Sequence, residues 1–167
     1  KASGVIPQIA YISGNCIGTC AAIASMFDVV VKKDEAALYV SSPALTGEKD
    51  AQDAIVSFHS SEKQCIGYII GLISFLPSNS SVGVQSSEIY TDNLNRKLGN
   101  LNFGGDAHSI ISVIADNSMF LELTHDYAPG ATTAFATLGG VKCGIVATSY
   151  QHNEGRIDVE SARKIAR

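Results

Sequence analysis

Near its start the chain reads Ile6-Pro-Gln-Ile-Ala-Tyr-Ile-Ser13, then Gly14-Asn-Cys-Ile-Gly-Thr-Cys20, then Ala21-Ala-Ile-Ala-Ser-Met-Phe27. The apolar first part predicts a buried strand, the glycine-containing middle predicts a turn, and the alanine-rich last part predicts a helix. Gly14 and Gly18 supply positive φ or close backbone approach at the turn. We therefore expect a strand, a glycine turn and a helix in succession.

The turn has two interpretations. The first N–H groups of a helix lack intrahelical acceptors and lie at the positive end of its dipole, so those of Gly18 and Thr19 are candidates to hold a developing oxyanion. Most such turns, however, only redirect the chain, and an isolated glycine motif is a weak signal. The local pattern alone leaves both open.

Three blocks in order carry a resemblance over nearly the whole chain. The first is the opening segment, the second is Phe120-Leu-Glu-Leu-Thr-His-Asp-Tyr-Ala-Pro129 with Ala134-Phe-Ala-Thr-Leu-Gly-Gly-Val-Lys-Cys-Gly-Ile-Val-Ala147, and the third is Ile157-Asp-Val-Glu-Ser-Ala-Arg-Lys-Ile-Ala166. Together they resemble the carboxyltransferase subunits of biotin-dependent acyl-CoA carboxylases and decarboxylases, which belong to the crotonase-like superfamily.

The resemblance implies an α/β, crotonase-like fold of repeated strand-helix units, with this chain a partial one spanning two related domains. Residues 1–84 would belong to the acyl-CoA-side domain and residues 85–167 to the biotin-side domain, joined by the Ser-, Asn- and Gly-rich segment 78–102. The family's glycine pair falls on Gly18 and Thr19. A peptide N–H survives the change to Thr19, while the branched side chain crowds the space above the turn.

The implied activity is carboxyl transfer between biotin and the α-carbon of an acyl-CoA, with the thioester enolate stabilised by the N–H groups of Gly18 and Thr19. Acyl-CoA would be the substrate, biotin would arrive on a separate carboxyl carrier, and a biotin carboxylase and further copies of the chain would be partners. Residues that bind CoA or biotin are not assigned.

Three alternatives stay open. A decarboxylase of the same family runs the transfer in reverse, and the sequence does not choose the direction. A scaffold subunit without activity would explain Thr19 at a glycine position. A serine peptidase of the same broad fold would need a nucleophile at the turn, where Gly18 stands, and no Ser-His pair is apparent.

Composition excludes several classes of protein. With 167 residues and 46% hydrophobic content the chain can bury a core of one domain or two small halves. A net charge of −4 and the absence of a basic stripe argue against nucleic-acid binding. The longest apolar run, 65–76, is shorter than a membrane span, and no signal peptide is recognised, so we expect a cytoplasmic protein.

Cysteine and histidine patterns predict neither metal nor redox chemistry. Cys16 and Cys20 are four residues apart, but no second close pair completes a zinc site, so all four cysteines are expected to be buried free thiols. The four histidines are scattered and are expected to be structural or exposed; His125 is the one hardest to dismiss. We expect no metal in this chain.

Further along the chain the pattern predicts three helices and three strands. The region 65–76 predicts a helix that ends before Pro77 and packs through one apolar face, whose residues recur at three- and four-residue spacing: Cys65, Ile66, Ile69, Ile70, Ile73 and Leu76. Residues 107–116 predict another helix, followed by a strand over 119–123. Gly139-Gly140 predicts a two-residue hairpin turn between strands 131–138 and 141–149. Asp158 is predicted to cap the last helix.

Overall fold

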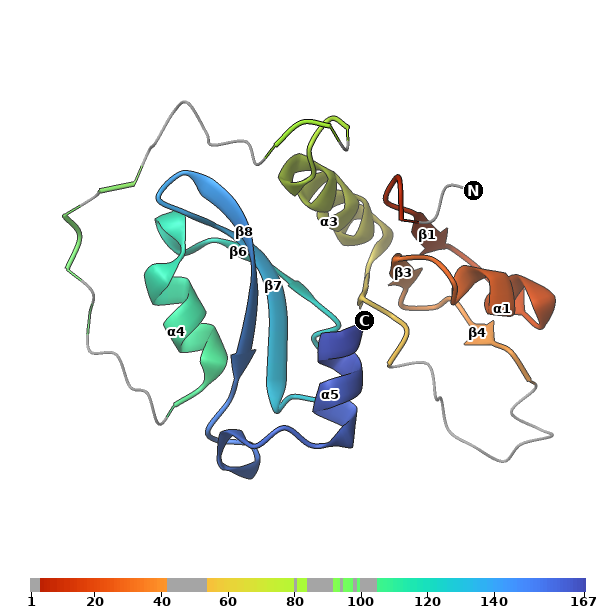
Figure 1. Cartoon of the computed structure of the whole chain (residues 1–167). Helices are drawn as coiled ribbons and strands as arrows, with labels where there is room; N and C mark the ends of the chain where they lie inside the picture. The colour runs from red at the N-terminus through yellow and green to blue at the C-terminus, as the bar shows by residue number, and fades with distance from the viewer. Residues whose placement is uncertain are drawn as a thin grey trace. The chain divides into compact units, whose positions relative to one another are not determined.

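The structure, a computed structural model, describes residues 4–41, 54–79, 81–83, 92–93, 95–97, 99 and 105–167 (Figure 1). Within it the chain forms two compact units, residues 1–70 and residues 71–167. The boundary after Ile70 lies inside helix α3 (Glu62–Phe75). Each unit has its own sheets, and each is described separately below.

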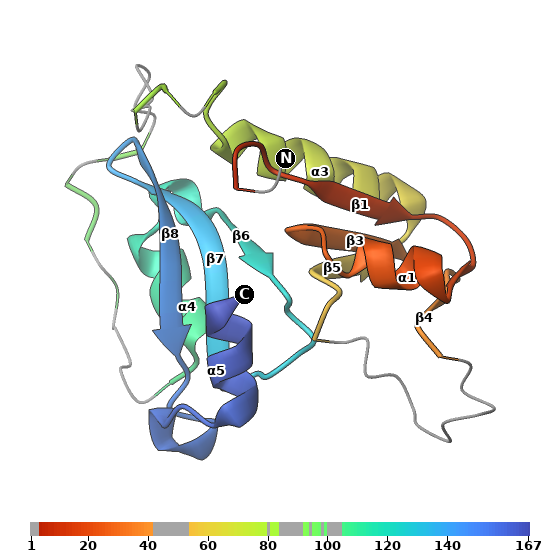
Figure 2. The same ribbon diagram turned by 45° about the vertical axis from the view of Figure 1, so that its right-hand side comes forward.

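A parallel three-stranded sheet forms the centre of the first unit. Its strands are β1 (Ile9–Ile12), β3 (Val29–Lys33) and β5 (Phe58–Ser60). Figure 2 shows β3 between β1 and β5, and the register pairs Ile9 with Val29 and Val31 with Phe58. Val29, Val30 and Val31 are all buried, as expected for an apolar run at the centre of a parallel sheet.

The turn after β1 contains a short strand that the sequence did not suggest. This strand, β2 (Cys16–Ile17), pairs in parallel with β4 (Leu38–Tyr39). Helix α1 (Thr19–Ala24) follows directly. The predicted order of strand, glycine turn and helix is therefore confirmed, although α1 ends three residues before Phe27. Ala21 and Ala24 of α1 pack into the core with Ile12, Val30 and Leu38.

Helix α3 shows a different buried face from the one expected. Cys65, Tyr68 and Leu72 are buried, whereas Ile66, Ile70 and Ile73 are 46%, 63% and 54% exposed. The prediction that these isoleucines pack against the core is wrong. Helical spacing alone does not decide which of two apolar faces is buried. Tyr68 stacks on Phe58 with ring centroids 4.3 Å apart, and this contact turns the face that carries Tyr68 toward the core.

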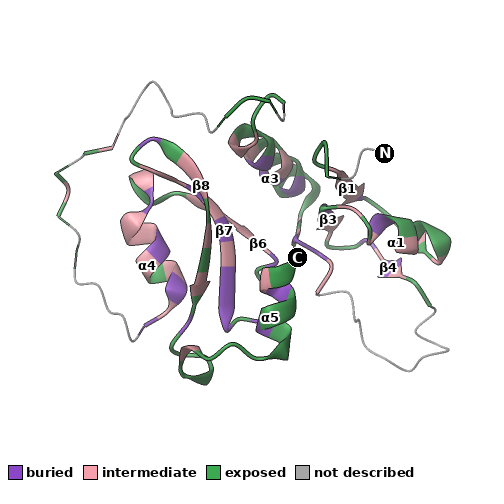
Figure 3. Cartoon of the chain, viewed as in Figure 1, coloured by how far each residue is buried: buried purple, intermediate pink, exposed green. Residues whose placement is uncertain are grey.

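The second unit contains an antiparallel sheet of three strands in the order β6 (Phe120–Leu123), β7 (Ala131–Leu138) and β8 (Val141–Thr148). Leu138 pairs with Val141 across Gly139 and Gly140, whose φ angles are 59° and 81°. The predicted two-residue hairpin is confirmed, because two successive positive φ angles are what such a turn requires. Figure 3 shows the buried residues concentrated along β7.

The two faces of this sheet receive different helices. Leu121 and Phe135 are register partners, and both meet the last turns of α3, since Phe135 stacks on Phe75 at 6.0 Å and Leu121 lies against Gly71. Adjacent strand residues point to opposite faces, so Glu122 and its partner Ala134 lie on the other one. That second face is covered by α4 (Ala107–Ile114) and α5 (Val159–Ala166).

These contacts explain why the units divide inside α3. The helix gives Cys65 and Tyr68 to the first unit and Gly71 and Phe75 to the second. The boundary predicted at residue 84 falls among residues that the structure does not describe. No described strand pairs across the two units, and their assignment to acyl-CoA and biotin sides stays a prediction.

The remaining described elements are two short 3-10 helices, η1 (Asp116–Ser118) and η2 (Asn153–Gly155). Asp158 caps α5 as predicted, since its carboxylate accepts a hydrogen bond from the N–H of Ser161. The described part of the chain contains no helix with the length and hydropathy needed to cross a bilayer.

Candidate functional site

Gly18, the first residue predicted to donate to an oxyanion, uses its N–H elsewhere. That N–H donates to the carbonyl of Tyr39 at 2.7 Å and extends the pairing of β2 with β4. The expectation that it is free for an oxyanion is therefore wrong, because the pairing of β2 with β4 was not foreseen. Gly18 has φ 64° and ψ −126°, a conformation that side chains rarely adopt, so its identity is explained by the turn.

Thr19, the second residue predicted to donate to an oxyanion, differs from Gly18 in the use of its N–H. It is the first residue of α1, it is exposed, and its N–H has no main-chain acceptor among the described residues. Two pockets among the described residues, one beside Phe75 and one beside Phe58, are lined by other side chains. A donor is thus present at Thr19, and its catalytic role stays a prediction.

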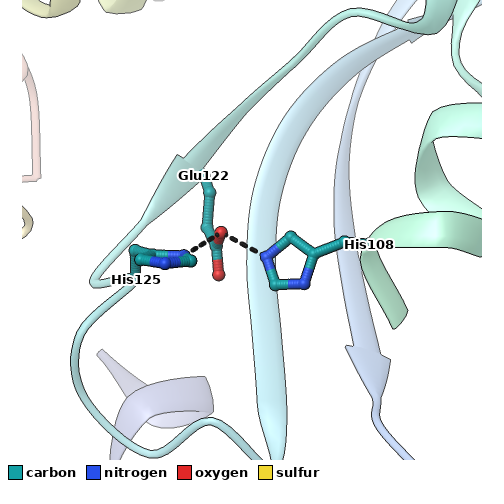
Figure 4. A group of neighbouring side chains, drawn as sticks. All are labelled: His108, Glu122 and His125. Atoms are coloured by element: carbon teal, nitrogen blue, oxygen red, sulfur yellow. Dashed lines mark hydrogen bonds and ion pairs between the residues drawn. The ribbon is translucent and has the colours of Figure 1, made fainter. Parts of the chain in front are cut away.

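A cluster of histidines and a carboxylate occupies the second unit. His108 comes from the first turn of α4, Glu122 from β6 and His125 from the turn after β6. Figure 4 shows both imidazole rings directed at the Glu122 carboxylate. His108 Nε2 lies 2.6 Å and His125 Nδ1 2.7 Å from the same atom, Glu122 Oε2. We call His108, Glu122 and His125 the histidine cluster.

The backbone of Thr124 places His125 in this cluster. In an extended strand residues 122 and 125 would point to opposite faces. Thr124 has φ 55°, an uncommon value for a β-branched residue, and the chain turns there. His125 consequently returns to the face that carries Glu122.

Two further charged residues contact the cluster. Asp106, the residue before α4, places its carboxylate 3.0 Å from His108 Nδ1. Lys164 of α5 brings its ammonium nitrogen to 3.8 Å from Glu122 Oε1, and its side chain is 1% exposed. The cluster thereby joins α4, β6 and α5.

The surroundings change the protonation of these groups. Burial disfavours the charged form of His108, but its hydrogen bonds to Glu122 and Asp106 outweigh burial and raise its pKa. Burial lowers the pKa of Lys164 in spite of the charges of Glu122 and Asp126. For Asp106, burial is outweighed by the hydrogen bond from His108, and the pKa falls.

Chemically the cluster can hold a proton or a cation between two imidazoles and one carboxylate. The three ligand atoms all lie within 4.8 Å of one another. The sequence analysis treated the histidines as scattered and missed this arrangement. The spacing of Glu122 and His125, three residues apart at the end of a predicted strand, was an available signal, whereas the approach of His108 depends on tertiary packing.

An apolar pocket of about 270 Å³ lies elsewhere in the second unit. Its lining residues come from the end of α3, the segment after it and the hairpin: Phe75, Leu76, Pro77, Val82, Gly83, Phe135, Lys142, Cys143 and Gly144. Lys142 is its cationic lining residue, and the ammonium donates a hydrogen bond to the carbonyl of Ser74. The pocket suits a small apolar group that carries an acceptor or an anion at one end.

All four cysteines are free thiols, as predicted. Cys65 is buried, and Cys16 and Cys143 are partly buried, but Cys20 is exposed on α1. The expectation of burial is wrong for Cys20, because α1 packs through Ala21 and Ala24 and leaves residue 20 on the opposite side.

Relatives with assigned activities support the resemblance. The chain is 29% identical over 192 aligned positions to the methylmalonyl-CoA decarboxylase subunit alpha of Veillonella parvula, covering 100% of this chain and 38% of that protein. It is 28% identical to the methylmalonyl-CoA carboxyltransferase 12S subunit of Propionibacterium freudenreichii subsp. shermanii, covering 99% of this chain and 36% of that one. The chain therefore spans less than two fifths of these relatives.

A solved structure agrees with the fold. The transcarboxylase 12S crystal structure, described as a hexamer with methylmalonyl-coenzyme A and methylmalonic acid bound, matches with a TM-score of 0.78 and 25% identity over 96% of this chain and 36% of that chain. The predicted crotonase-like α/β fold is confirmed. The model of the carboxyl transferase domain family matches residues 54–167. The chain belongs to the carboxyl transferase domain family.

Proposed function

We propose that the protein to which this chain belongs transfers a carboxyl group between biotin and the α-carbon of an acyl-CoA. The match of residues 54–167 to the carboxyl transferase family carries the proposal. Methylmalonyl-CoA, bound in the transcarboxylase 12S structure, indicates a short branched acyl-CoA as the first substrate to test. Biotin would arrive on a separate carrier protein and be charged by a biotin carboxylase.

The backbone donor at Thr19 is our candidate for enolate stabilisation. Forming an enolate at a thioester is the difficult step, and a donor aimed at its oxygen stabilises charge that grows in the transition state. The N–H of Thr19 supports this role because no described main-chain acceptor uses it. Gly18, whose N–H is bonded to Tyr39, would shape the turn, and the second donor would come from another residue.

The direction of transfer has two candidates. The similarity to the decarboxylase subunit alpha of Veillonella parvula favours transfer from a carboxylated acyl-CoA to biotin, and the similarity to the 12S carboxyltransferase favours transfer onto an acceptor. Both directions use the same enolate and the same donor. One assay in each direction separates them.

The test is a transfer assay on the whole protein with its flanking regions. Propionyl-CoA and acetyl-CoA are offered with carboxybiotin, and methylmalonyl-CoA and malonyl-CoA with free biotin and with the carrier. Carboxyl transfer in either direction supports the proposal. A folded protein that is inactive with every pair would instead support a scaffold subunit without activity.

We propose that the chain assembles with further copies of itself. The exposed isoleucines of α3, Ile66, Ile70 and Ile73, support this, because an apolar helix face in water favours a protein contact. The 12S relative is described as a hexamer. Light scattering after size exclusion measures the assembly, and Ile70→Glu should reduce it if this face is used. A cytoplasmic location stays a prediction.

A further inference from the structure

Both ring nitrogens of His108 face a carboxylate, but a neutral imidazole has only one N–H to donate. His108 Nδ1 faces Asp106 at 3.0 Å, and its Nε2 faces Glu122 at 2.6 Å. A neutral imidazole carries one N–H, so one of these two contacts would join a lone pair to a carboxylate oxygen. Either a second proton or a metal cation must therefore lie on the His108 ring.

The local charge balance favours a cation. Asp106, Glu122 and Asp126 bring three carboxylates to this region, and Lys164 brings one ammonium. Lys164 is held at 3.8 Å from Glu122 Oε1, and its ammonium makes no hydrogen bond among the described residues. Lys164 faces one oxygen of this carboxylate, Oε1, while both histidines face the other, Oε2.

The ligand atoms match a transition metal. Two imidazole nitrogens and one carboxylate oxygen form a set that zinc uses with a fourth, open position. Zinc lies about 2.0–2.2 Å from such atoms, so tetrahedral ligands are separated by roughly 3.3 Å. The present separations, from 2.6 Å up to the 4.8 Å limit, bracket that value, and shifts of roughly 1 Å in the side chains would meet it.

The second carboxylate is placed as in metal sites. A histidine that binds metal through one nitrogen usually donates its other N–H to a carboxylate, which fixes the tautomer and the ring orientation. Asp106 accepts from His108 Nδ1 and leaves Nε2 for the metal. The His125 side chain is 59% exposed, so an ion can enter from solvent.

We propose that His108 Nε2, Glu122 Oε2 and His125 Nδ1 form a binding site for a divalent transition metal, with zinc as the reference ion and water as the fourth ligand. Coordination releases the protons that these two nitrogens share with Glu122, so that one dication replaces up to two protons. The site would fasten α4 to the end of β6. It is independent of the proposed carboxyl transfer.

Calorimetric titration of ZnCl₂ into the full chain tests the proposal. The background is Cys20→Ser, which removes the exposed thiol as a competing ligand. One zinc ion per chain is expected, with an affinity that rises with pH because zinc competes with protons for the imidazole nitrogens. The ionisable groups around the site are Asp106, Glu122, His125, Lys164 and Asp126.

Three variants distinguish the site from adventitious binding. His125→Ala removes an exposed ligand and should lower zinc affinity about 100-fold, and Asp106→Asn should lower it by roughly 10- to 100-fold. His152→Ala, an exposed histidine of the same unit, is the matched control and should bind as the parent does. Circular dichroism verifies that each variant is folded.

Cobalt(II) provides an independent measurement. Its visible absorption should show nitrogen and oxygen ligation without thiolate charge transfer in the parent, and this spectrum should disappear in His125→Ala. Equal zinc affinity in the parent, His125→Ala and His152→Ala would overturn the proposal. A cobalt spectrum with thiolate bands that persist in His125→Ala would also overturn it.

Discussion

Lys164 holds its ammonium nitrogen 3.8 Å from Oε1 of Glu122, with its own side chain 1% exposed. The two residues belong to α5 and β6, and this ion pair is one of the contacts between those elements. A buried ion pair adds little to the free energy of unfolding when both partners are present. Removing one partner lowers that free energy strongly, because a charge is left buried without its partner.

Glu122→Gln is therefore expected to destabilise the chain by about 3–5 kcal/mol, because it removes the carboxylate that is paired with the buried Lys164 ammonium. Urea denaturation followed by circular dichroism measures this loss. The double variant Glu122→Gln with Lys164→Met should recover the part of this loss that is due to Lys164, since the buried ammonium is removed together with its partner. A double variant no more stable than Glu122→Gln alone would mean that the ion pair is not the cause.

The protonation of His108 predicts a pH dependence of stability. The pKa of His108 is raised in the folded chain, so its contribution is fully present below the unfolded value of about 6.5 and is lost as the pH rises through the folded value. Asp106 has a lowered pKa, and its contribution is present above about 3.9 and is lost as the pH falls through its folded value.

The experiment is a pH series of urea midpoints for the parent and His108→Gln without added metal. The difference between the two isolates the contribution of His108, because Glu122, His125 and Lys164 are present in both proteins. The difference in urea midpoint should become smaller as the pH rises through the folded-state pKa of His108. A difference that is independent of pH would show that His108 is not protonated by its two carboxylate neighbours.

Substitutions at Thr19 test the proposed donor. Thr19→Pro removes the N–H. It should raise the activation barrier by about 3–4 kcal/mol, which lowers turnover roughly a hundred- to a thousandfold. Proline is tolerated at the first position of a helix, where Thr19 stands, so the fold should survive. Thr19→Gly keeps the N–H and removes the branched side chain, so it should retain activity while the preferred acyl chain changes.

Steady-state kinetics on a panel of acyl-CoAs measures both effects in the whole protein. Equal turnover of Thr19→Pro and Thr19→Gly would reject the donor role. Loss of activity in both variants would show that the Thr19 side chain is required, since Thr19→Gly keeps the N–H.

The hairpin turn gives a stability prediction with a matched pair. A Cβ atom added at Gly139 would have no atom within 4 Å apart from its chain neighbours, so substitutions there report mainly on its φ of 59°. Gly139→Val should cost about 1–2 kcal/mol, because a branched residue is strained in this conformation. Gly139→Asn should cost much less, since Asn-Gly is a preferred pair in such turns. Thermal unfolding of the two variants compares them, and equal melting temperatures would contradict this account.

The features that could be predicted from the sequence are those set by neighbouring residues. Strand β1, the hairpin at Gly139-Gly140 and the cap at Asp158 follow from local apolar runs, backbone preferences and a short hydrogen bond. The family and the crotonase-like fold followed from three ordered blocks of residues.

The features that could not be predicted depend on contacts between distant residues. Strand β2 exists because Cys16 and Ile17 pair with Leu38 and Tyr39, and this pairing takes the N–H of Gly18. His108 and Glu122 meet because α4 packs on the sheet that contains β6, which the spacing of 14 residues does not reveal. The choice of inward face on α3 has the same origin.

Because Cys20 is exposed, its thiol can be labelled selectively with a spectroscopic probe. A thiolate adds to the double bond of a maleimide. Burial raises the pKa of the thiols of Cys16, Cys65 and Cys143, which should therefore react slowly. Cys20, directly after Thr19, should react first. A fluorophore attached there would report, by a change in emission, whether an acyl-CoA approaches the first turn of α1.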